Sequence, residues 1–368
     1  MKNQILYKIA VSLIPGIGGI LARNLIAYTG SVEGVFKEKY SALMKIPGIG
    51  EKNARNISNP ENLKRAEKEL RFITENNIRA FFYTDKDYPR RLRSCADAPI
   101  LFYLKGNVNL DVRKVVSVVG TRNASDYGKE VCDTMIRDFS EHDPQILIVS
   151  GLAYGIDIQA HKSALKYNLP TVAVLGHGLD LLYPSLHSDT ARKMQENGGL
   201  VSDFPSRTKI DAPNFIRRNR IIAGLSDATI VVESGPKGGA LVTADIAASY
   251  NRDVFAIPGR VNDPWSKGCN KLIKNNGAAL AESVKDIEYI MGWEESDKKA
   301  DAVQKQLFVE LDAEEEIICN LLRATGNMFI DRICAEAKLP MGKVSSLLLN
   351  LEFKGVVTAL PGKMYKMR

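Results

Sequence analysis

Cysteine and histidine are scarce in this sequence, and neither is spaced as in a metal site. The 368 residues include five cysteines, which are scattered and never arranged as CxxC, and only four histidines. The odd number and irregular spacing of the cysteines predict reduced thiols in a cytoplasmic protein, with no zinc site and no other cofactor. The histidines also lack the spacing of a catalytic triad.

Long apolar runs are missing as well, which predicts a protein without a membrane span. The N-terminus lacks the small-residue cleavage site of a secretory signal. Hydrophobic residues make up 45% of the chain and charged residues 25%, as in an ordinary soluble protein of two or three domains. A net charge of +7 and an isoelectric point near 9.0 permit a polyanionic partner without proving one.

Two loops of nearly the same sequence occur close to the N-terminus. Residues 13–19 read LIPGIGG and residues 45–50 read KIPGIG, with the two prolines 32 residues apart, which suggests a duplicated helical unit. Proline ends the incoming helix, glycine allows a positive φ, and the next helix opens with free N–H groups that suit a phosphate. The pattern resembles the helix-hairpin-helix motif. We expect a helical, SAM-like domain over residues 1–78, whose turns either contact a phosphate or only pack.

A second region, residues 79–292, alternates apolar β-branched runs with helix-length amphipathic segments. The runs that we expect to be strands are 115–120, 146–151, 171–176, 200–204, 228–235 and 253–259. Continuous apolar strands that alternate with helices predict a buried parallel sheet, and hence an α/β, doubly wound, extended Rossmann-like domain. Residues 293–312 turn polar and are expected to form a linker. Residues 313–368 fit three helices and a hairpin around Pro361-Gly362, which together make a winged helix.

Glycine ends five of the predicted strands, in VVGTR, VSGLAYGID, VLGHGLD, VVESGPKGGA and AIPGR. The carboxyl ends of parallel strands share one edge of a sheet, and ligands bind in the crevice beyond them. Glycine lets a phosphate approach the backbone closely. The first loop is not GxGxxG and no GxxxxGK[ST] occurs, so we expect neither an NAD site nor an NTPase site.

Separated cations accompany these loops. The stretch NFIRRNRIIAGL carries Arg217, Arg218 and Arg220 at the start of a predicted helix, and Arg122 follows the first strand of the alternating series. Lys237 lies in the loop GPKGG and Lys209 lies just upstream of the arginines. Guanidinium groups match phosphate oxygens, and several separated cations suit an extended polyanion better than a small nucleotide.

At these residues the sequence resembles the DNA-processing protein A (DprA/Smf) family. The matching stretches include VVGTRNASDYG (118–128), VSGLAYGIDIQAHKSAL (149–165), NFIRRNRIIAGLSDATIVVE (214–233) and GGALVTADIAA (238–248), and they cover most of residues 80–290. The resemblance implies a homodimer that binds single-stranded DNA during natural transformation. It also implies that the protein helps to load RecA recombinase past single-strand-binding protein, without an established catalytic activity. The DNA-binding residues that we carry over or infer are Gly120, Thr121, Arg122, Ser150, Gly151, Tyr154, Lys209, Arg217, Arg218, Asn219, Arg220, Lys237, Gly238 and Gly239.

Three positions depart from the family pattern. Tyr154 stands where the family commonly has a cation, Ile216 where it often has proline, and Gly238 where it usually has serine. The absence of a cation at position 154 puts one phosphate contact in doubt. A tyrosine there either stacks on a base or has no role toward the ligand.

The alternative function is a nucleotide-cleaving phosphoribohydrolase of related fold, whose signature PGGxGTxxE needs a placed glutamate. Asp245 stands near that position instead, and the other acidic candidates are Asp157 and Glu233. We expect Asp157 to be a helix N-cap, and His161 and His177 to be structural. The sequence therefore predicts a binding protein and not an enzyme.

Overall fold

The computed structural model describes residues 2–293, 311–360 and 363–367. The chain divides into two compact units, Met1–Glu294 and Glu295–Arg368. Among the described residues, no helix is both long and apolar enough to cross a membrane. Most of the linker predicted at 293–312 and the turn at Pro361-Gly362 lie outside the described residues.

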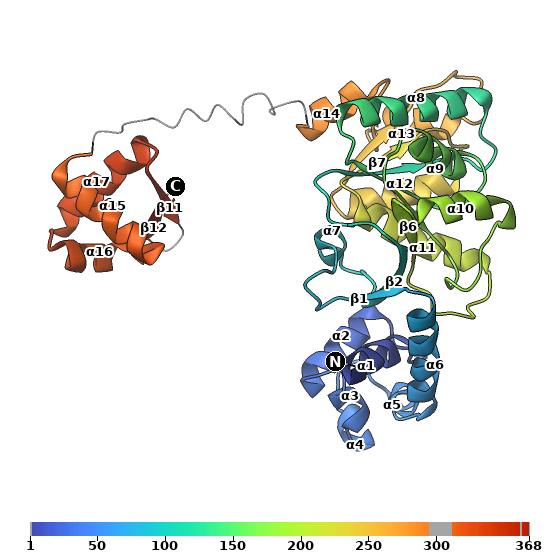
Figure 1. The fold of residues 1–368 in the computed structure, drawn as a ribbon, viewed down its shortest axis with the longest axis horizontal. Coiled ribbons are helices and arrows are strands. Elements are labelled where there is room, and N and C mark those ends of the chain that lie inside the picture. Colours follow the sequence, from blue (N-terminus) through green and yellow to red (C-terminus); the bar gives the residue numbers. More distant parts are fainter. Residues whose placement is uncertain (1, 294–310, 361–362, 368) are drawn as a thin grey trace. The chain divides into compact units, whose positions relative to one another are not determined.

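The first unit begins with six helices (Figure 1), whose bounds are α1 Lys2–Ser12, α2 Gly19–Thr29, α3 Gly34–Lys37, α4 Tyr40–Leu43, α5 Glu51–Ile57 and α6 Glu61–Glu75. The two IPGIG loops behave as their sequence predicts: Gly16 and Gly48 have φ values of 79° and 83°, and α2 and α5 begin directly after the second glycine of each loop. The first loop packs against α5, the helix that follows the second loop, since the side-chain amide of Asn56 donates to the carbonyl of Pro15 at 2.8 Å.

Helix α2, which follows the first IPGIG loop, packs against the rest of the unit. Arg23 of α2 donates to the carbonyl of Ala98 at 3.1 Å, and the side chains of the six helices share one apolar cluster with residues of the central sheet. The helical region therefore belongs to the same compact unit as the sheet. In this arrangement the start of α2 is used for packing.

A nine-stranded sheet forms the centre of the unit, in the order β1-β2-β6-β5-β4-β3-β7-β8-β9. Its strands are β1 Arg79–Phe82, β2 Leu101–Gly106, β3 Val115–Val119, β4 Leu147–Ser150, β5 Thr171–Val174, β6 Gly198–Ser202, β7 Ala228–Val231, β8 Asp253–Ala256 and β9 Ala279–Leu280. From β6 to β9 all neighbours are parallel, while β2 pairs antiparallel with both β1 and β6. The predicted doubly wound sheet is thus confirmed, and every strand predicted in the alternating region is present.

Helices cover both faces of this sheet, because successive side chains of each strand point to opposite sides. Val116 and Val118 of β3 pack in one cluster with residues of α8 and α9, whereas Val115 and Val119 pack in the other cluster with residues of α11 and α12. The helices of this region are α7 Arg90–Arg93, α8 Asp126–His142, α9 Ile156–Lys166, α10 Ser188–Met194, α11 Ala212–Leu225, α12 Gly239–Ser249, α13 Lys267–Lys274 and α14 Val284–Met291.

The second unit is the predicted winged helix. It comprises α15 Ala313–Thr325, β10 Asn327–Phe329, α16 Ile330–Ala337, α17 Met341–Phe353, β11 Val357–Leu360 and β12 Met364–Met367, with the three strands paired in the order β10-β12-β11. Its own core contains Ile318, Leu322, Ile333, Leu348 and Leu351, all fully buried. This core is separate from the cores of the first unit, as expected for a domain that can fold on its own.

Candidate nucleic-acid interface

The order of the strands places a ligand crevice between β3 and β7. The chain runs outward from β3 through β4, β5 and β6 on one side, and through β7, β8 and β9 on the other. At such a reversal the loops after neighbouring strands part and leave a crevice at their carboxyl ends. A cavity of about 300 Å³ lies there, which we call the switch-point cavity. Its lining includes Gly120, Thr121, Arg122, Arg218, Asn219, Gly238 and Gly239, all of them predicted site residues.

One wall of the switch-point cavity is the start of α12. Gly238 is the N-cap of this 11-residue helix, and a side chain added at Gly239 would meet no atom within 4 Å. The first N–H groups of a helix have no partner within the helix, and they carry the positive end of its dipole. The open backbone at Gly239 therefore lets an anion reach these groups.

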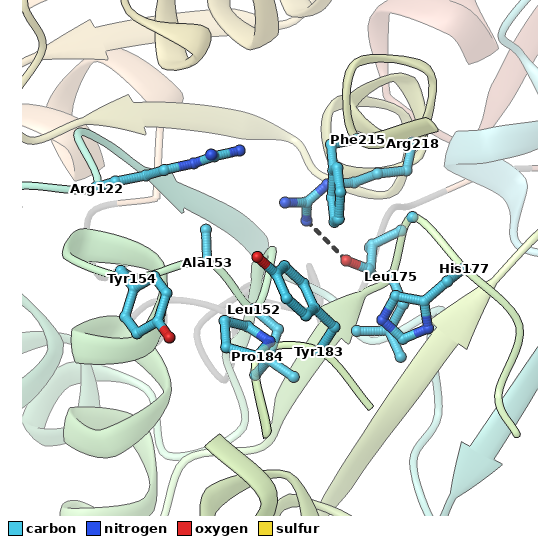
Figure 2. Close-up of a pocket in the computed structure, with 12 residues that line it drawn as sticks. Arg122, Leu152, Ala153, Tyr154, Leu175, His177, Tyr183, Pro184, Phe215 and Arg218 are labelled. Atoms are coloured by element: carbon cyan, nitrogen blue, oxygen red, sulfur yellow. Dashed lines mark hydrogen bonds between the residues drawn. The ribbon is translucent and has the colours of Figure 1, made fainter. Parts of the chain in front are cut away.

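Two arginines reach the cavity from different elements. Figure 2 shows the guanidinium groups of Arg122 and Arg218 pointing toward each other. Arg122, on the loop after β3, is exposed and makes no hydrogen bond or ion pair within the part of the chain that the structure describes. Asn219 also lines the cavity, and it is half-buried. Together these groups offer an anion one free guanidinium and one amide.

Arg218, in contrast, is only 5% exposed, and its guanidinium group is held in place by two neighbouring residues. Its Nη1 donates to the carbonyl of Val174 at 2.7 Å, and its Nη2 lies 3.5 Å from Oδ2 of Asp157. The Nε atom of Arg218 is buried and has no partner among the described residues. Gly151 makes room for this arrangement, because a Cβ there would lie 2.0 Å from Arg218 Nη1.

Burial works against the charges of this ion pair. Burial lowers the pKa of Arg218, and the nearby positive charge of Arg122 lowers it further, whereas the negative charge of Asp157 raises it. Burial likewise raises the pKa of Asp157, opposed by Arg218. Two guanidinium groups facing one carboxylate leave the cavity with excess positive charge, which an anion between them would neutralise.

A smaller cavity of about 90 Å³ adjoins the first and shares Arg122, Ala153, Phe215 and Arg218 with it; we call it the aromatic pocket. Its other walls are mostly apolar and include Leu152, Tyr154, Leu175, His177, Tyr183 and Pro184. In Figure 2 the ring of Tyr183 lies in the middle of the pocket, and its centroid is 6.0 Å from that of Phe215. A flat apolar group can enter here beside the cationic cavity.

Tyr154, at the position where the resemblance led us to expect a cation, lines this pocket. Its ring is 46% exposed and meets His187 edge-on, with 5.0 Å between the ring centroids. His187 is fixed in turn, because its Nδ1 lies 2.8 Å from the carbonyl oxygen of Leu152. Tyr154 therefore has both a supported position and an open face, so stacking on a base is geometrically possible.

The remaining predicted residues lie elsewhere. Ser150 is fully buried and donates to the carbonyl of Val118 at 2.6 Å, so it packs the core beneath the loops. Arg220 points away from both cavities, and its guanidinium bonds Asp203 and the carbonyl of Asp97. Arg217 is exposed and lies over the ring of Phe204 at 5.2 Å. Lys209 and Lys237 are exposed and line neither cavity.

The acidic groups near the cavities are engaged in structural contacts. Glu233, which is 1% exposed, accepts hydrogen bonds from the backbone and the hydroxyl of Ser125 at the start of α8. The expectation that Asp157 is a helix N-cap is wrong: Gly155 caps α9, and Asp157 lies inside its first turn. Among the described residues that line either cavity, Asp157 has the only carboxylate, and it forms an ion pair with Arg218.

The two histidines in the strand-end loops have different surroundings. His161 is fully buried between the hydroxyl of Thr171 and the carbonyl of Gly151, and burial lowers its pKa to about 4. A neutral, enclosed imidazole of this kind is structural. His177 lines the aromatic pocket, with its Nδ1 at 2.9 Å from the carbonyl oxygen of Gly178.

Sequence reasoning missed Tyr183 and Phe215, which form the centre of the aromatic pocket. Phe215 directly precedes the arginine cluster, and Tyr183 follows the strand-end glycine loop VLGHGLD. Neither residue is charged or a glycine, so the patterns of charge and glycine did not indicate them. An aromatic side chain next to each loop was the signal that could have identified them.

Comparison with known proteins agrees with this geometry. Residues 79–291 match the family described as DNA recombination-mediator protein A, and residues 303–363 match the DprA winged helix domain. Protein Smf of Synechocystis is 32% identical to this chain over 403 residues, which covers 98% of each protein. Protein Smf of Escherichia coli is 33% identical and covers 83% of this chain and 82% of its own.

Two solved structures of DNA processing protein A are also similar. The protein from Streptococcus pneumoniae superposes with a TM-score of 0.62 at 31% identity, over 78% of this chain and 97% of its own. The protein from Helicobacter pylori, described for its single-stranded DNA binding mode, has a TM-score of 0.53 at 26% identity, over 59% of this chain and 96% of its own. The fold, the sequence match and the coverage together show that this chain belongs to the DNA recombination-mediator protein A family, the DprA/Smf family.

Proposed function

We propose that this protein binds single-stranded DNA at the two joined cavities. A phosphate occupies the switch-point cavity between Arg122, Arg218 and the start of α12. A neighbouring base enters the aromatic pocket against Tyr183 and Phe215. The observation that carries the proposal is the shared wall: Arg122 and Arg218 line both cavities, so one nucleotide can place its phosphate and its base there together.

The geometry favours a single strand over a duplex. The aromatic pocket lies below the loops and admits a base only when that base is unpaired and free to leave a stack. The groups available to the phosphate are backbone amides and guanidinium groups, which carry no sequence information. We therefore expect little sequence preference and a clear loss of affinity with salt.

The biological role that we propose is that of a recombination mediator in natural transformation. The protein would protect incoming single strands and help to load RecA recombinase on them, in competition with single-strand-binding protein and as a homodimer. This part of the proposal rests on the family and on the expectation from the sequence.

The competing hypothesis, a nucleotide-cleaving enzyme, needs a carboxylate free to stabilise an oxocarbenium-like transition state. Asp157 is tied to Arg218 and Glu233 to Ser125, while Asp245 is exposed on α12 and lines neither cavity. Release of free base from nucleoside monophosphates would favour this enzyme and contradict the binding function as the main activity.

Fluorescence anisotropy with labelled single-stranded and duplex oligonucleotides of equal length tests the proposal. We expect tighter binding to the single strand. A second comparison, between an oligothymidylate and the same backbone without bases, tests the aromatic pocket. The bases should add about 1–3 kcal/mol, and the Tyr183→Ala variant should lose part of this gain. Equal affinity for duplex DNA would overturn the proposal.

A further inference from the structure

A basic groove lies on the same unit, between α6 and the loop that follows β6. Its volume is about 410 Å³, and its charged lining consists of Arg65, Lys68, Arg71, Glu75, Asp180 and Arg207. The four cations come from segments that lie far apart in the sequence, namely α6 of the helical region and residues 205–207. The groove therefore exists only because the helical region packs on the sheet.

The two walls of the groove are joined by a buried polar network. Glu69 of α6 is 1% exposed, and its carboxylate accepts hydrogen bonds from the backbone N–H of Ser206 at 2.9 Å and from its hydroxyl at 2.6 Å. Arg65 pairs with the same carboxylate at 2.9 Å and donates to the carbonyl of Ser206. A buried network that satisfies its members in this way holds both walls in one arrangement.

The other three cations of the groove are not part of this network. Lys68, Arg71 and Arg207 are exposed, and within residues 2–293 their side chains make no hydrogen bond or ion pair. The carboxylate of Asp180 accepts the backbone N–H of Arg207 at 2.9 Å and is not paired with these cations. Since the charge of Arg65 is met by Glu69, the three other cations outnumber the two carboxylates of the lining, and the groove attracts anions.

One loop contributes residues to both the groove and the aromatic pocket. His177 and Tyr183 line the pocket, and Asp180, which lies between them in the sequence, lines the groove. This loop packs directly on the opposite wall, because a Cβ at Gly178 would lie 2.4 Å from the carbonyl oxygen of Pro205. Asp180 is three positions after His177, so the Cα atoms of these two lining residues are no more than about 11 Å apart.

From this shared loop we propose that the basic groove is a second binding site for the phosphates of the same single strand, which passes from the aromatic pocket over the loop at 178–182 to α6. The inference rests on the proposed function. Lys68 and Arg71 lie on one face of α6, about one helical turn or 5 Å apart, which is on the scale of successive phosphates in an extended strand. The helical region would thus contact DNA through α6 and not through its IPGIG turns.

The test compares a short and a long oligothymidylate, of about 4 and about 16 nucleotides, the range of site sizes known for single-strand-binding folds. The variant is Lys68→Gln/Arg71→Gln. The matched control is Lys37→Gln/Lys39→Gln, which removes the same charge from exposed positions of the helical region outside the groove. Each protein is titrated by anisotropy at several salt concentrations, and circular dichroism checks its fold.

We expect the groove variant to bind the short oligomer like the control, and to bind the long oligomer more weakly. Its slope of log affinity against log salt should fall by about 1.4 for the long oligomer, since each phosphate contact in a single strand contributes about 0.7. Identical binding of the groove variant and the control at both lengths and at every salt concentration would overturn the inference. So would a groove variant that binds both oligomers unchanged and loses affinity only for an acidic peptide such as polyglutamate.

These outcomes are distinguishable from a failure of the proposed function. If the switch-point cavity is not the DNA site, Arg122→Ala binds the short oligomer as tightly as the parent does. If only the groove proposal fails, Arg122→Ala weakens the binding of both oligomers while the groove variant weakens neither.

Discussion

The buried pair of Arg218 and Asp157 allows a prediction about stability that is independent of DNA. Replacement of Arg218 by methionine keeps much of the volume but removes the charge that faces Asp157. The carboxylate is then left unpaired in the core, and the carbonyl of Val174 no longer accepts a hydrogen bond from Nη1. Breaking a buried pair from one side costs about 3–5 kcal/mol of unfolding free energy.

The pH dependence of this destabilisation identifies its cause. Burial already raises the pKa of Asp157 above its ordinary 3.8, so the folded state holds the proton more tightly than the unfolded state, and stability falls as the pH rises through this window. Without Arg218 the pKa rises further. The destabilisation of Arg218→Met should therefore be larger at neutral pH than close to the ordinary pKa of aspartate.

Urea unfolding followed by circular dichroism measures both effects. Arg217→Met is the matched control, because its side chain is 61% exposed and should change the unfolding free energy by no more than about 0.5 kcal/mol. The double variant Asp157→Asn/Arg218→Met removes the buried charge and should recover part of the stability. The reasoning is refuted if Arg218→Met unfolds like Arg217→Met, or if the double variant is no more stable than Arg218→Met.

Two further predictions concern groups that lie outside the cavities. Arg220→Ala should lower the unfolding free energy by about 3 kcal/mol, because Asp203, whose side chain is 2% exposed, loses its nearer ionic partner and keeps Arg217 Nη2 at 3.8 Å. A melting temperature equal to that of the parent would contradict this. Burial lowers the pKa of His161 to about 4, so the unfolded state takes up a proton between pH 6.5 and 4 that the folded state does not. The unfolding free energy should therefore fall by roughly 3 kcal/mol as the pH is lowered from 6.5 to 4. His161→Gln should make the unfolding free energy, measured in urea at a series of pH values, depend less on pH.

The parallel sheet could be predicted from the sequence because its strands are short, continuous apolar runs bounded by glycine. The two-residue β9 has no such run and was not predicted. Gly16 and Gly48 were also assigned correctly, since the turn chemistry of IPGIG is local. Where the signal is carried by a few neighbouring residues, the pattern is sufficient.

The roles of single residues in the candidate site depended on packing between distant segments. The glycine of a strand-end loop was interpreted as a sign of phosphate approach, yet a Cβ at Gly120 would lie 2.4 Å from Ile156, and Gly151 leaves room for Arg218. These glycines are thus required by loop packing as well. Which arginine of RRNR faces the cavity also depends on Asp157 and Asp203, and the sequence spacing does not show where those carboxylates lie.

The measurement that tests the central claim most directly is the salt dependence of single-stranded DNA binding by Arg122→Ala. Arg122 is exposed on the loop after β3 and lines both cavities, so its removal should leave the fold intact. We predict weaker binding and a slope of log affinity against log salt that is smaller by about 0.7, because the variant neutralises one phosphate fewer. Binding equal to that of the parent at every salt concentration would contradict the assignment of these cavities to DNA.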